Sequence, residues 1–219
     1  MGRPAGLPFF VLITMTSLQS DPPDLDALFA DLAHPNPHLQ TEAYLAMVEH
    51  HPEASMPRLI ALLDQPDVSL RRAAVRGLGA FGATALQPLA SLFASSDDGT
   101  VRASCVKAYA QIASNYPDQE FSQEAMAVLK AALDDPSPVV SQSAVMALGQ
   151  VGEQALPLLI SICQGTNLAH IQSAAMALAE SKDPQAEVCL RQVLANPETD
   201  DLVREMVDAS LARLVSMKG

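Results

Sequence analysis

The sequence is poor in aromatic and in basic residues. Its 219 residues include no tryptophan, six phenylalanines and three tyrosines, so aromatic side chains are too few to make up most of a hydrophobic core. The apolar 49% consists mainly of alanine, leucine, valine and methionine, and alanine and leucine favour closely packed helices. Lysine and arginine number 13 against 25 acidic residues, which gives a net charge of −12. This balance argues against a nucleic-acid partner and against an anionic membrane surface.

Cysteine and histidine are also scarce, and their spacing predicts no metal site. Cys105, Cys163 and Cys189 form no Cys-x-x-Cys pair and fall within apolar helical patterns. We interpret them as buried, reduced thiols of a cytosolic protein. His34 and His38 are four residues apart, but the prolines of the stretch HPNPH prevent a regular helix from bringing them together. No Ser/His/Asp or Cys/His arrangement identifies a catalytic residue.

The first twenty residues differ in composition from the rest of the chain. An apolar run over residues 7–13 is too short to span a bilayer, and no small-residue cleavage site follows it. We interpret residues 1–20 as an unstructured extension ahead of the true start at Met15, with a targeting segment as the alternative. Residues 21–219 are predicted to form a single domain without membrane insertion.

A short motif recurs along the remaining chain. RRAAVRGL at residues 71–78 is matched by RASCVKAY at 102–109, SQSAVMAL at 141–148 and IQSAAMAL at 171–178. Weaker copies are QTEAYLAM at 40–47 and REMVDASL at 204–211. Adjacent copies are about thirty residues apart, with one eight-residue expansion over 115–122. Repeats of this length are typical of solenoid proteins.

Each copy follows a second amphipathic stretch, such as MPRLIALLD, ALQPLASLFA or ALPLLISICQ. Apolar residues in these stretches recur with the helical period, and a polar connector separates the two halves of each unit. A helix–turn–helix unit cannot bury its apolar face alone, but stacked units can. The sequence therefore predicts an all-α, right-handed α-solenoid of about six short helical hairpins.

The glycines of LRRAAVRGLGAFG, residues 70–82, belong to this repeat and not to a phosphate-binding loop. Gly77 occupies a position that holds alanine or serine in the other copies, so it is predicted to permit close helix packing. No predicted strand precedes it, as a dinucleotide or P-loop motif requires. Gly79, Gly82, Gly149 and Gly152 are predicted to end the second helices of their units.

Four arginines are candidates for binding a ligand. Arg71 and Arg102 hold equivalent positions in adjacent units, and Arg72 and Arg76 are i, i+4 neighbours on one helix. One interpretation is structural, with the junction arginines bridging units through acidic residues such as Asp64, Asp67 or Asp98. The other is an anion clamp, because arginine binds carboxylates bidentately.

Paired aspartates lie in the predicted turns, at residues 97–98, 134–135 and 200–201. Aspartate in a turn accepts hydrogen bonds from the free N–H groups at the start of the next helix. We therefore expect these pairs to cap helices, with contact to a partner as the alternative.

Two stretches carry a resemblance to a known family. DQPDVSLRRAAVRGLGAFG at residues 64–82 and DDPSPVVSQSAVMALGQVG at 134–152 resemble HEAT repeats, most of all those of the phycobilin-lyase-type family. That family includes the E- and F-type subunits of phycocyanin bilin lyases. The resemblance covers roughly residues 25–215, and the uninterrupted array of six units is most similar to the phycobilisome-degradation branch, NblB.

The resemblance implies a cytoplasmic protein on phycobilisomes at the thylakoid surface, with phycocyanin or allophycocyanin as its partner. A further HEAT-repeat subunit or a degradation adaptor would be a second partner. If it is an enzyme, it is a lyase with phycocyanobilin as substrate or ligand, acting in bilin attachment, detachment or phycobilisome degradation. Arg71, Arg72, Arg76 and Arg102 would contact the propionates of the bilin. The alternative is a scaffold or adaptor without catalysis.

Overall fold

The computed structural model describes residues 22–218, and all regular elements in that range are helices. They pair into six helical hairpins, numbered here as units 1–6, which confirms the predicted α-solenoid. The first helices of the units are α1 (Leu25–Leu32), α3 (Pro52–Ala61), α5 (Ala83–Ser95), α7 (Gln123–Leu133), α9 (Leu156–Cys163) and α11 (Pro184–Ala195). The second helices are α2 (Pro37–His50), α4 (Val68–Ala80), α6 (Gly99–Asn115), α8 (Pro138–Val151), α10 (Leu168–Ala179) and α12 (Asp201–Lys218). Short 3-10 turns, Leu62–Asp64 and Gly152–Ala155, extend α3 and precede α9. The predicted extension 1–20 lies outside the described residues.

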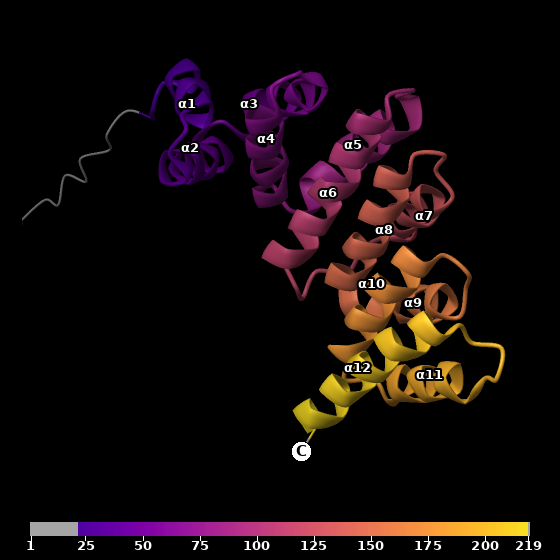
Figure 1. Ribbon diagram of the computed structural model, residues 1–219. Coiled ribbons are helices and arrows are strands. Elements are labelled where there is room, and N and C mark those ends of the chain that lie inside the picture. The colour runs from indigo at the N-terminus through magenta and orange to yellow at the C-terminus, as the bar shows by residue number, and fades with distance from the viewer. Residues whose placement is uncertain (1–21, 219) are drawn as a thin grey trace, which may run out of the picture.

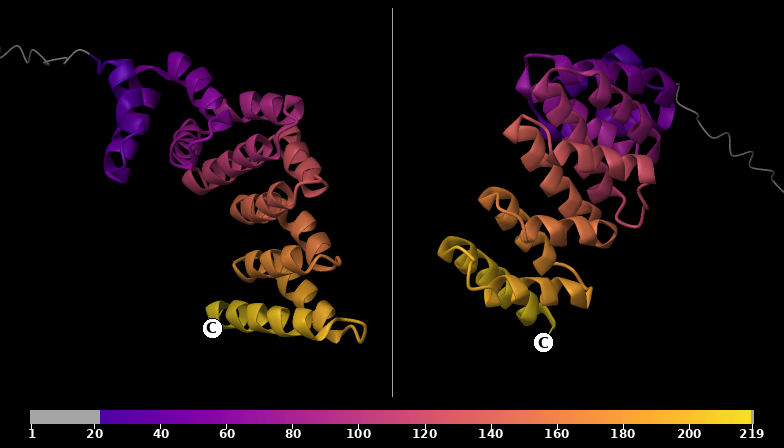
Figure 2. Two further views of the ribbon diagram at one scale, coloured as in Figure 1. Left: turned by 45° about the horizontal axis from the view of Figure 1, so that its top comes forward. Right: turned by 90° about the vertical axis from the view of Figure 1, so that its right-hand side faces the viewer.

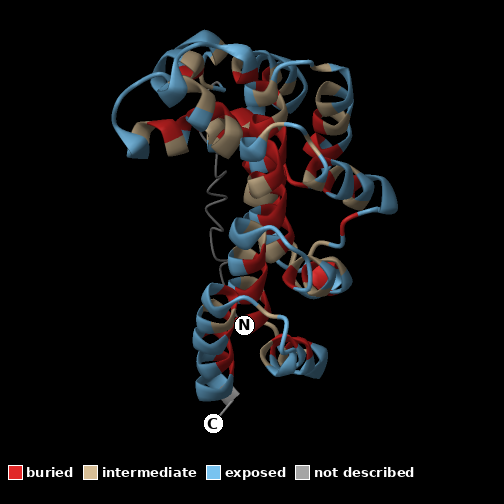
Figure 3. Ribbon diagram, turned by 45° about the vertical axis from the view of Figure 1, so that its right-hand side comes forward, coloured by how far each residue is buried: buried red, intermediate tan, exposed pale blue. Residues whose placement is uncertain are grey.

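The units stack into an arc (Figure 1). The second helices form its inner side, and the first helices α5, α7, α9 and α11 lie on its outer side (Figures 1 and 2). Consecutive second helices pack against one another along the array, and α6 makes the most extensive contacts, with α4 and α8. The buried residues form a continuous band between the two layers (Figure 3). We call the surface of the second helices on the inner side the concave face.

Two of the three aspartate pairs cap the helix that follows, as predicted, whereas the pair at 134–135 does not, because α8 begins after Ser137 without a side-chain capping hydrogen bond and Asp135 instead binds Arg102. Oδ1 of Asp98 accepts from the backbone N–H of Thr100 at 2.5 Å and of Val101 at 3.3 Å. These hydrogen bonds stabilise the carboxylate and hold the pKa of Asp98 below its usual value. Asp200 caps α12 in the same way, accepting from Leu202 N–H at 2.8 Å.

The glycines fall into two groups, and only one matches the prediction. Gly82 and Gly152 follow the ends of α4 and α8 with φ of 60° and 71°, a left-handed conformation that favours glycine. The prediction that Gly79 and Gly149 also end helices is wrong, because both lie inside them. A Cβ on Gly79 would stand 2.2 Å from Cγ of Gln111 on α6, and one on Gly149 would stand 3.1 Å from a methyl group of α10. These two glycines instead let second helices approach closely.

The eight-residue expansion contributes one residue, Phe121, to the core. Tyr109 is fully buried and packs its ring 6.0 Å from that of Phe121, while its hydroxyl donates to Leu86 O at 2.9 Å. The side chain of Gln154 accepts from Phe121 N–H at 2.9 Å and donates to Phe121 O at 2.6 Å. The longer connector between units 3 and 4 is thereby held to the start of unit 5.

The three cysteines are buried and free, as expected from their apolar surroundings. Burial raises the pKa of the Cys105 thiol to about 12. A hydrogen bond with Cys189, together with burial, raises the pKa of the Cys163 thiol above its usual range. Cys105 and Cys163 are therefore neutral thiols at physiological pH.

One stretch, residues 138–163, has the length and hydropathy of a membrane-spanning helix. In the structure it forms two helices, α8 and α9, between which the chain turns at Gly152. Val145 and Leu148 of this stretch are fully buried in the core. Its apolar character serves the packing of units 4 and 5.

Candidate functional site: a basic groove on the concave face

A groove of about 750 Å³ runs between α4 and α6 on the concave face and reaches the start of α8. Arg71, Arg72 and Arg76 line it from α4, and Lys107 lines it from α6. The structure thus brings together three of the four arginines predicted to bind a ligand. We call this surface the basic groove. Four of the 13 lysines and arginines of an acidic chain converge there.

Asp98 is the acidic residue among those that line the basic groove. Its carboxylate faces the N–H groups of the first turn of α6, which offset its charge. The local field of the groove is therefore positive, in contrast to the net charge of the chain.

Unit 1 holds Arg76 in position. The guanidinium of Arg76 donates to Oε1 of Gln40 on α2, and Nε2 of Gln40 donates to His34 O at 2.8 Å. Gln40 is buried, with 4% of its surface exposed, so this chain of hydrogen bonds leaves it little freedom. A site that uses Arg76 therefore depends on two units.

The other cations of the groove differ in how they are held. Nη1 of Arg71 donates to Gln65 O at 2.5 Å and Pro66 O at 3.0 Å. These hydrogen bonds hold the connector that precedes α4 against the helix. Arg72 and Lys107 are exposed, and neither has a hydrogen-bond or ion-pair partner among residues 22–218. Their charges are available to a ligand.

Arg102 lies outside the groove and bridges units 3 and 4. Its Nε and Nη2 donate to Oδ2 and Oδ1 of Asp135 at 2.6 and 3.0 Å, and its Nη1 donates to Ser96 O at 3.0 Å. The side chains of Arg102 and Asp135 are only 15% and 6% exposed. The hydrogen bond to Arg102 holds the pKa of Asp135 below its usual value. Bridging by a junction arginine was expected, but through Asp64, Asp67 or Asp98, and the acceptor is instead Asp135.

The walls of the basic groove also present apolar surface. Val68 and Val139 are 48% and 57% exposed, and Val75 lies between the arginines of α4. A ligand with carboxylates at one side and an apolar body would match both kinds of wall.

The four residues predicted from the sequence to bind a ligand do not include Lys107. Within the eight-residue motif it occupies the sixth position, which Arg76 fills one unit earlier. Equivalent residues of a solenoid stack along one face. Comparison of the motif copies at that position would have identified Lys107 from the sequence.

Comparison with known proteins identifies HEAT repeats in the chain and two similar proteins. The family model for HEAT repeats matches residues 25–110 and 123–212. The bilin biosynthesis protein CpeZ of Synechococcus sp. (strain WH8020) is 44% identical over 184 residues, covering 81% of this chain and 99% of that protein. The uncharacterized phycocyanin operon protein Z of Pseudanabaena tenuis (strain PCC 7409) is 37% identical over 196 residues, covering 89% and 97%.

Solved structures agree on the fold. A designed armadillo repeat protein has a TM-score of 0.51 at 19% identity, covering 88% of this chain and all of its own. The crystal structure of YibA from E. coli has a TM-score of 0.54 at 17% identity, covering 89% and 74%. Both likenesses agree with the six stacked hairpins as the fold of this chain.

Proposed function

The chain belongs to the family of HEAT-repeat proteins that includes CpeZ, and from that premise we propose that it handles bilins during phycobiliprotein assembly. The basic groove receives the propionate carboxylates of a linear tetrapyrrole such as phycocyanobilin. One observation carries this proposal: Arg71, Arg72, Arg76 and Lys107 line a single groove in a chain of net charge −12.

The chemistry of the groove suits an amphiphilic dianion. Arg72 and Arg76 present planar guanidinium groups that can bind a carboxylate through two parallel hydrogen bonds. Lys107, on the opposite helix, offers a point charge for the second propionate. The exposed Val68 and Val139 offer surface to the apolar rings. Arg102 is left out of the proposed set because its guanidinium is engaged by Asp135.

Attachment is the step that the names of the relatives favour, since one speaks of bilin biosynthesis and the other of a phycocyanin operon. In attachment, the thiol of a phycobiliprotein cysteine adds across a double bond of the bilin: the S–H bond breaks, sulfur bonds to one carbon, the proton goes to the other, and no group leaves. The proposed role of this chain is to hold the bilin by its propionates and present the reacting end to phycocyanin or allophycocyanin. A role in detachment or degradation, as in the NblB branch, stays a prediction, as do a second HEAT-repeat subunit and a site of action at the thylakoid surface.

A binding titration tests the groove. Phycocyanobilin is titrated into the protein and followed by its visible spectrum, in parallel with the dimethyl ester, which lacks the propionate charges. We expect the ester, and the double variant Arg72→Gln/Lys107→Gln, to bind at least about tenfold more weakly. Lys130→Gln removes an exposed lysine of α7, outside the groove, and should bind like the unaltered protein. Equal binding of acid and ester would overturn the proposal.

A second experiment separates a lyase from an adaptor. Apo-phycocyanin subunits are incubated with phycocyanobilin, with and without the protein, and pigment that stays on the denatured polypeptide is measured. A lyase increases this covalent pigment, and the increase falls in Arg72→Gln/Lys107→Gln. Co-elution with phycocyanin without a change in covalent pigment identifies an adaptor. Loss of pigment from holo-phycocyanin, run alongside, identifies detachment.

A further inference from the structure

The junction position of the repeat, the first residue of the eight-residue motif, is arginine in units 2, 3 and 6, and in all three its guanidinium donates to backbone carbonyls of its own unit. In unit 6, Arg204 donates to the carbonyls of residues 194, 196 and 199. In units 2 and 3 the geometry is shared. Arg71 donates to Gln65 O and Arg102 to Ser96 O, in each case the carbonyl six residues earlier in its own unit. Arg102 also reaches Asp135, which stands six residues before the junction position of the next unit. One guanidinium therefore connects a carbonyl of one unit with a carboxylate of the next.

Between units 5 and 6 the same two acceptors are present and the arginine is absent. The junction residue of unit 5 is Ile171, and the residue six positions earlier is Gly165. In unit 6 the residue six positions before the junction residue Arg204 is Glu198. Gly165 thus corresponds to Ser96, and Glu198 corresponds to Asp135.

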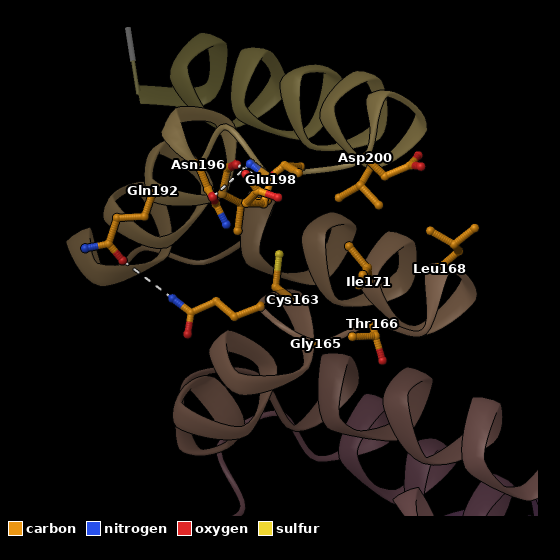
Figure 4. Close-up of a pocket in the computed structure, with 13 residues that line it drawn as sticks. Cys163, Gly165, Thr166, Leu168, Ile171, Gln192, Asn196, Glu198 and Asp200 are labelled. Atoms are coloured by element: carbon orange, nitrogen blue, oxygen red, sulfur yellow. Dashed lines mark hydrogen bonds between the residues drawn. The ribbon is translucent and has the colours of Figure 1, made fainter.

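A cavity of about 520 Å³ lies at this position, lined by Gly165, Ile171 and Glu198 together with Cys163. Figure 4 shows Ile171 and Cys163 on the unit-5 side and Glu198 on the connector between α11 and α12. Glu198 is exposed, and its carboxylate has no partner among the residues that the structure describes. The cavity therefore stands where the side chain of Arg102 stands two units earlier.

The remaining walls suit a long cation with a polar head. Val193 and Val203 offer apolar surface to a methylene stem, and the amides of Gln164 and Gln192, 3.5 Å apart, flank the polar side. Cys163 contributes a neutral thiol, since its hydrogen bond with Cys189 and burial raise its pKa. The charge of the site comes from Glu198 and from Asp200, which also caps α12.

We propose that this cavity binds an arginine side chain of a partner protein. The bound guanidinium would join units 5 and 6 in the way that the guanidinium of Arg102 joins units 3 and 4. Arginine fits better than lysine because its planar fork can reach a carbonyl and a carboxylate at once, as Arg102 does. The site is separate from the basic groove, so its test does not depend on the proposed bilin function.

N-acetyl-arginine amide is the probe, added to the full chain and followed by isothermal calorimetry and by NMR of backbone amides of the connectors 164–167 and 196–200. N-acetyl-citrulline amide has the same shape without the charge, and N-acetyl-lysine amide has the charge without the fork. We expect saturable binding of the arginine probe, with the citrulline and lysine probes at least about tenfold weaker. Equal binding of the citrulline probe, or no binding of the arginine probe up to its solubility limit, would overturn the proposal.

Two variants locate the site. Glu198→Gln should weaken the arginine probe at least about tenfold, while Glu205→Gln, an exposed carboxylate of α12 outside the cavity, should leave it unchanged. Ile171→Arg should fill the cavity with the chain's own guanidinium and abolish binding. Because Ile171 is buried, its variant is informative only if its circular dichroism is unaltered, and Glu198→Gln carries the test without it. Undiminished binding in Glu198→Gln would contradict the proposed site.

Discussion

The concave face changes its chemistry halfway along the array. At the sixth position of the motif, units 2 and 3 carry Arg76 and Lys107, whereas units 4 and 5 carry Met146 and Met176. The two methionines are 61% and 54% exposed, so helix packing does not require them. The fold determines the buried positions of each second helix and leaves this exposed position free. The difference between the halves is therefore a difference of surface chemistry on one scaffold.

The contacts between units also differ between the two halves, because Arg102 joins units 3 and 4 through Asp135 whereas unit 5 has Ile171 at the same position. Removing Arg102 has the largest expected effect on stability. Arg102→Ala leaves the carboxylate of Asp135 buried without its cation, and we expect a loss of about 3 kcal/mol in the free energy of unfolding. Urea denaturation measures it. Arg191→Ala, which removes an exposed i, i+4 pair with Glu187 in unit 6, should cost about 0.5 kcal/mol. Similar losses in both variants would contradict the distinction between the buried pair that joins two units and a pair within one helix.

Close helix packing is the next comparison. Gly79→Ala places a methyl group 2.2 Å from Cγ of Gln111, so α4 and α6 must move apart, at a cost of about 2 kcal/mol. Gly149→Ala meets α10 at 3.1 Å, and the helix propensity gained, about 1 kcal/mol, offsets that contact. Urea denaturation should rank the Gly79 variant well below the Gly149 variant. The reverse order would show that α8 and α10 are the more tightly packed pair.

Exchanging the residue types at the sixth motif position between the two halves should change ligand affinity without changing the stability of the fold. Lys107→Met should weaken phycocyanobilin binding about tenfold, because it removes a charge from the basic groove. Met176→Lys adds a charge on the same face two units away and should alter the affinity less than about twofold. Both variants should unfold within about 0.5 kcal/mol of the unaltered protein. An equal effect of the two on affinity would show that the ligand contacts the whole concave face.

The smallest expected effect is the pH dependence of stability that the Arg102–Asp135 pair confers. The pKa of Asp135 is lowered by Arg102, so the pair contributes stability above the unfolded pKa, near 4, and loses it as the pH falls through the folded value. Urea midpoints should drop between pH 7 and about pH 3, and the drop should be smaller in Arg102→Ala. An identical drop in both proteins would place the acid sensitivity elsewhere.

The sequence predicted the array well because its signals are local. Apolar residues at the helical period and turn aspartates such as Asp98 and Asp200 identify helices and their first residues within a few positions. The two misplaced glycines, Gly79 and Gly149, show the limit. The sequence does not distinguish a glycine that ends a helix from one that allows a neighbouring helix to pack closely. For Gly79, it is the distance to Gln111 in the structure that identifies the second role.

The candidate site was predictable in part for the same reason. Arg72 and Arg76 share a helix face, so their proximity follows from periodicity. The acceptor of Arg102 could not be found locally, because Asp135 lies 33 residues away, beyond the expansion that interrupts the repeat spacing. Lys107 required the copies to be compared position by position, as did the correspondence of Glu198 with Asp135.

The support that Gln40 gives to Arg76 has a dynamic consequence. Unit 1 packs on one neighbouring unit within the described chain, and the end units of a solenoid fray more readily than the inner ones. Each time α2 opens, Arg76 loses its acceptor, so a ligand held by Arg76 favours the closed state of unit 1. Occupation of the basic groove should therefore slow amide hydrogen exchange in α2, a helix that does not line the groove.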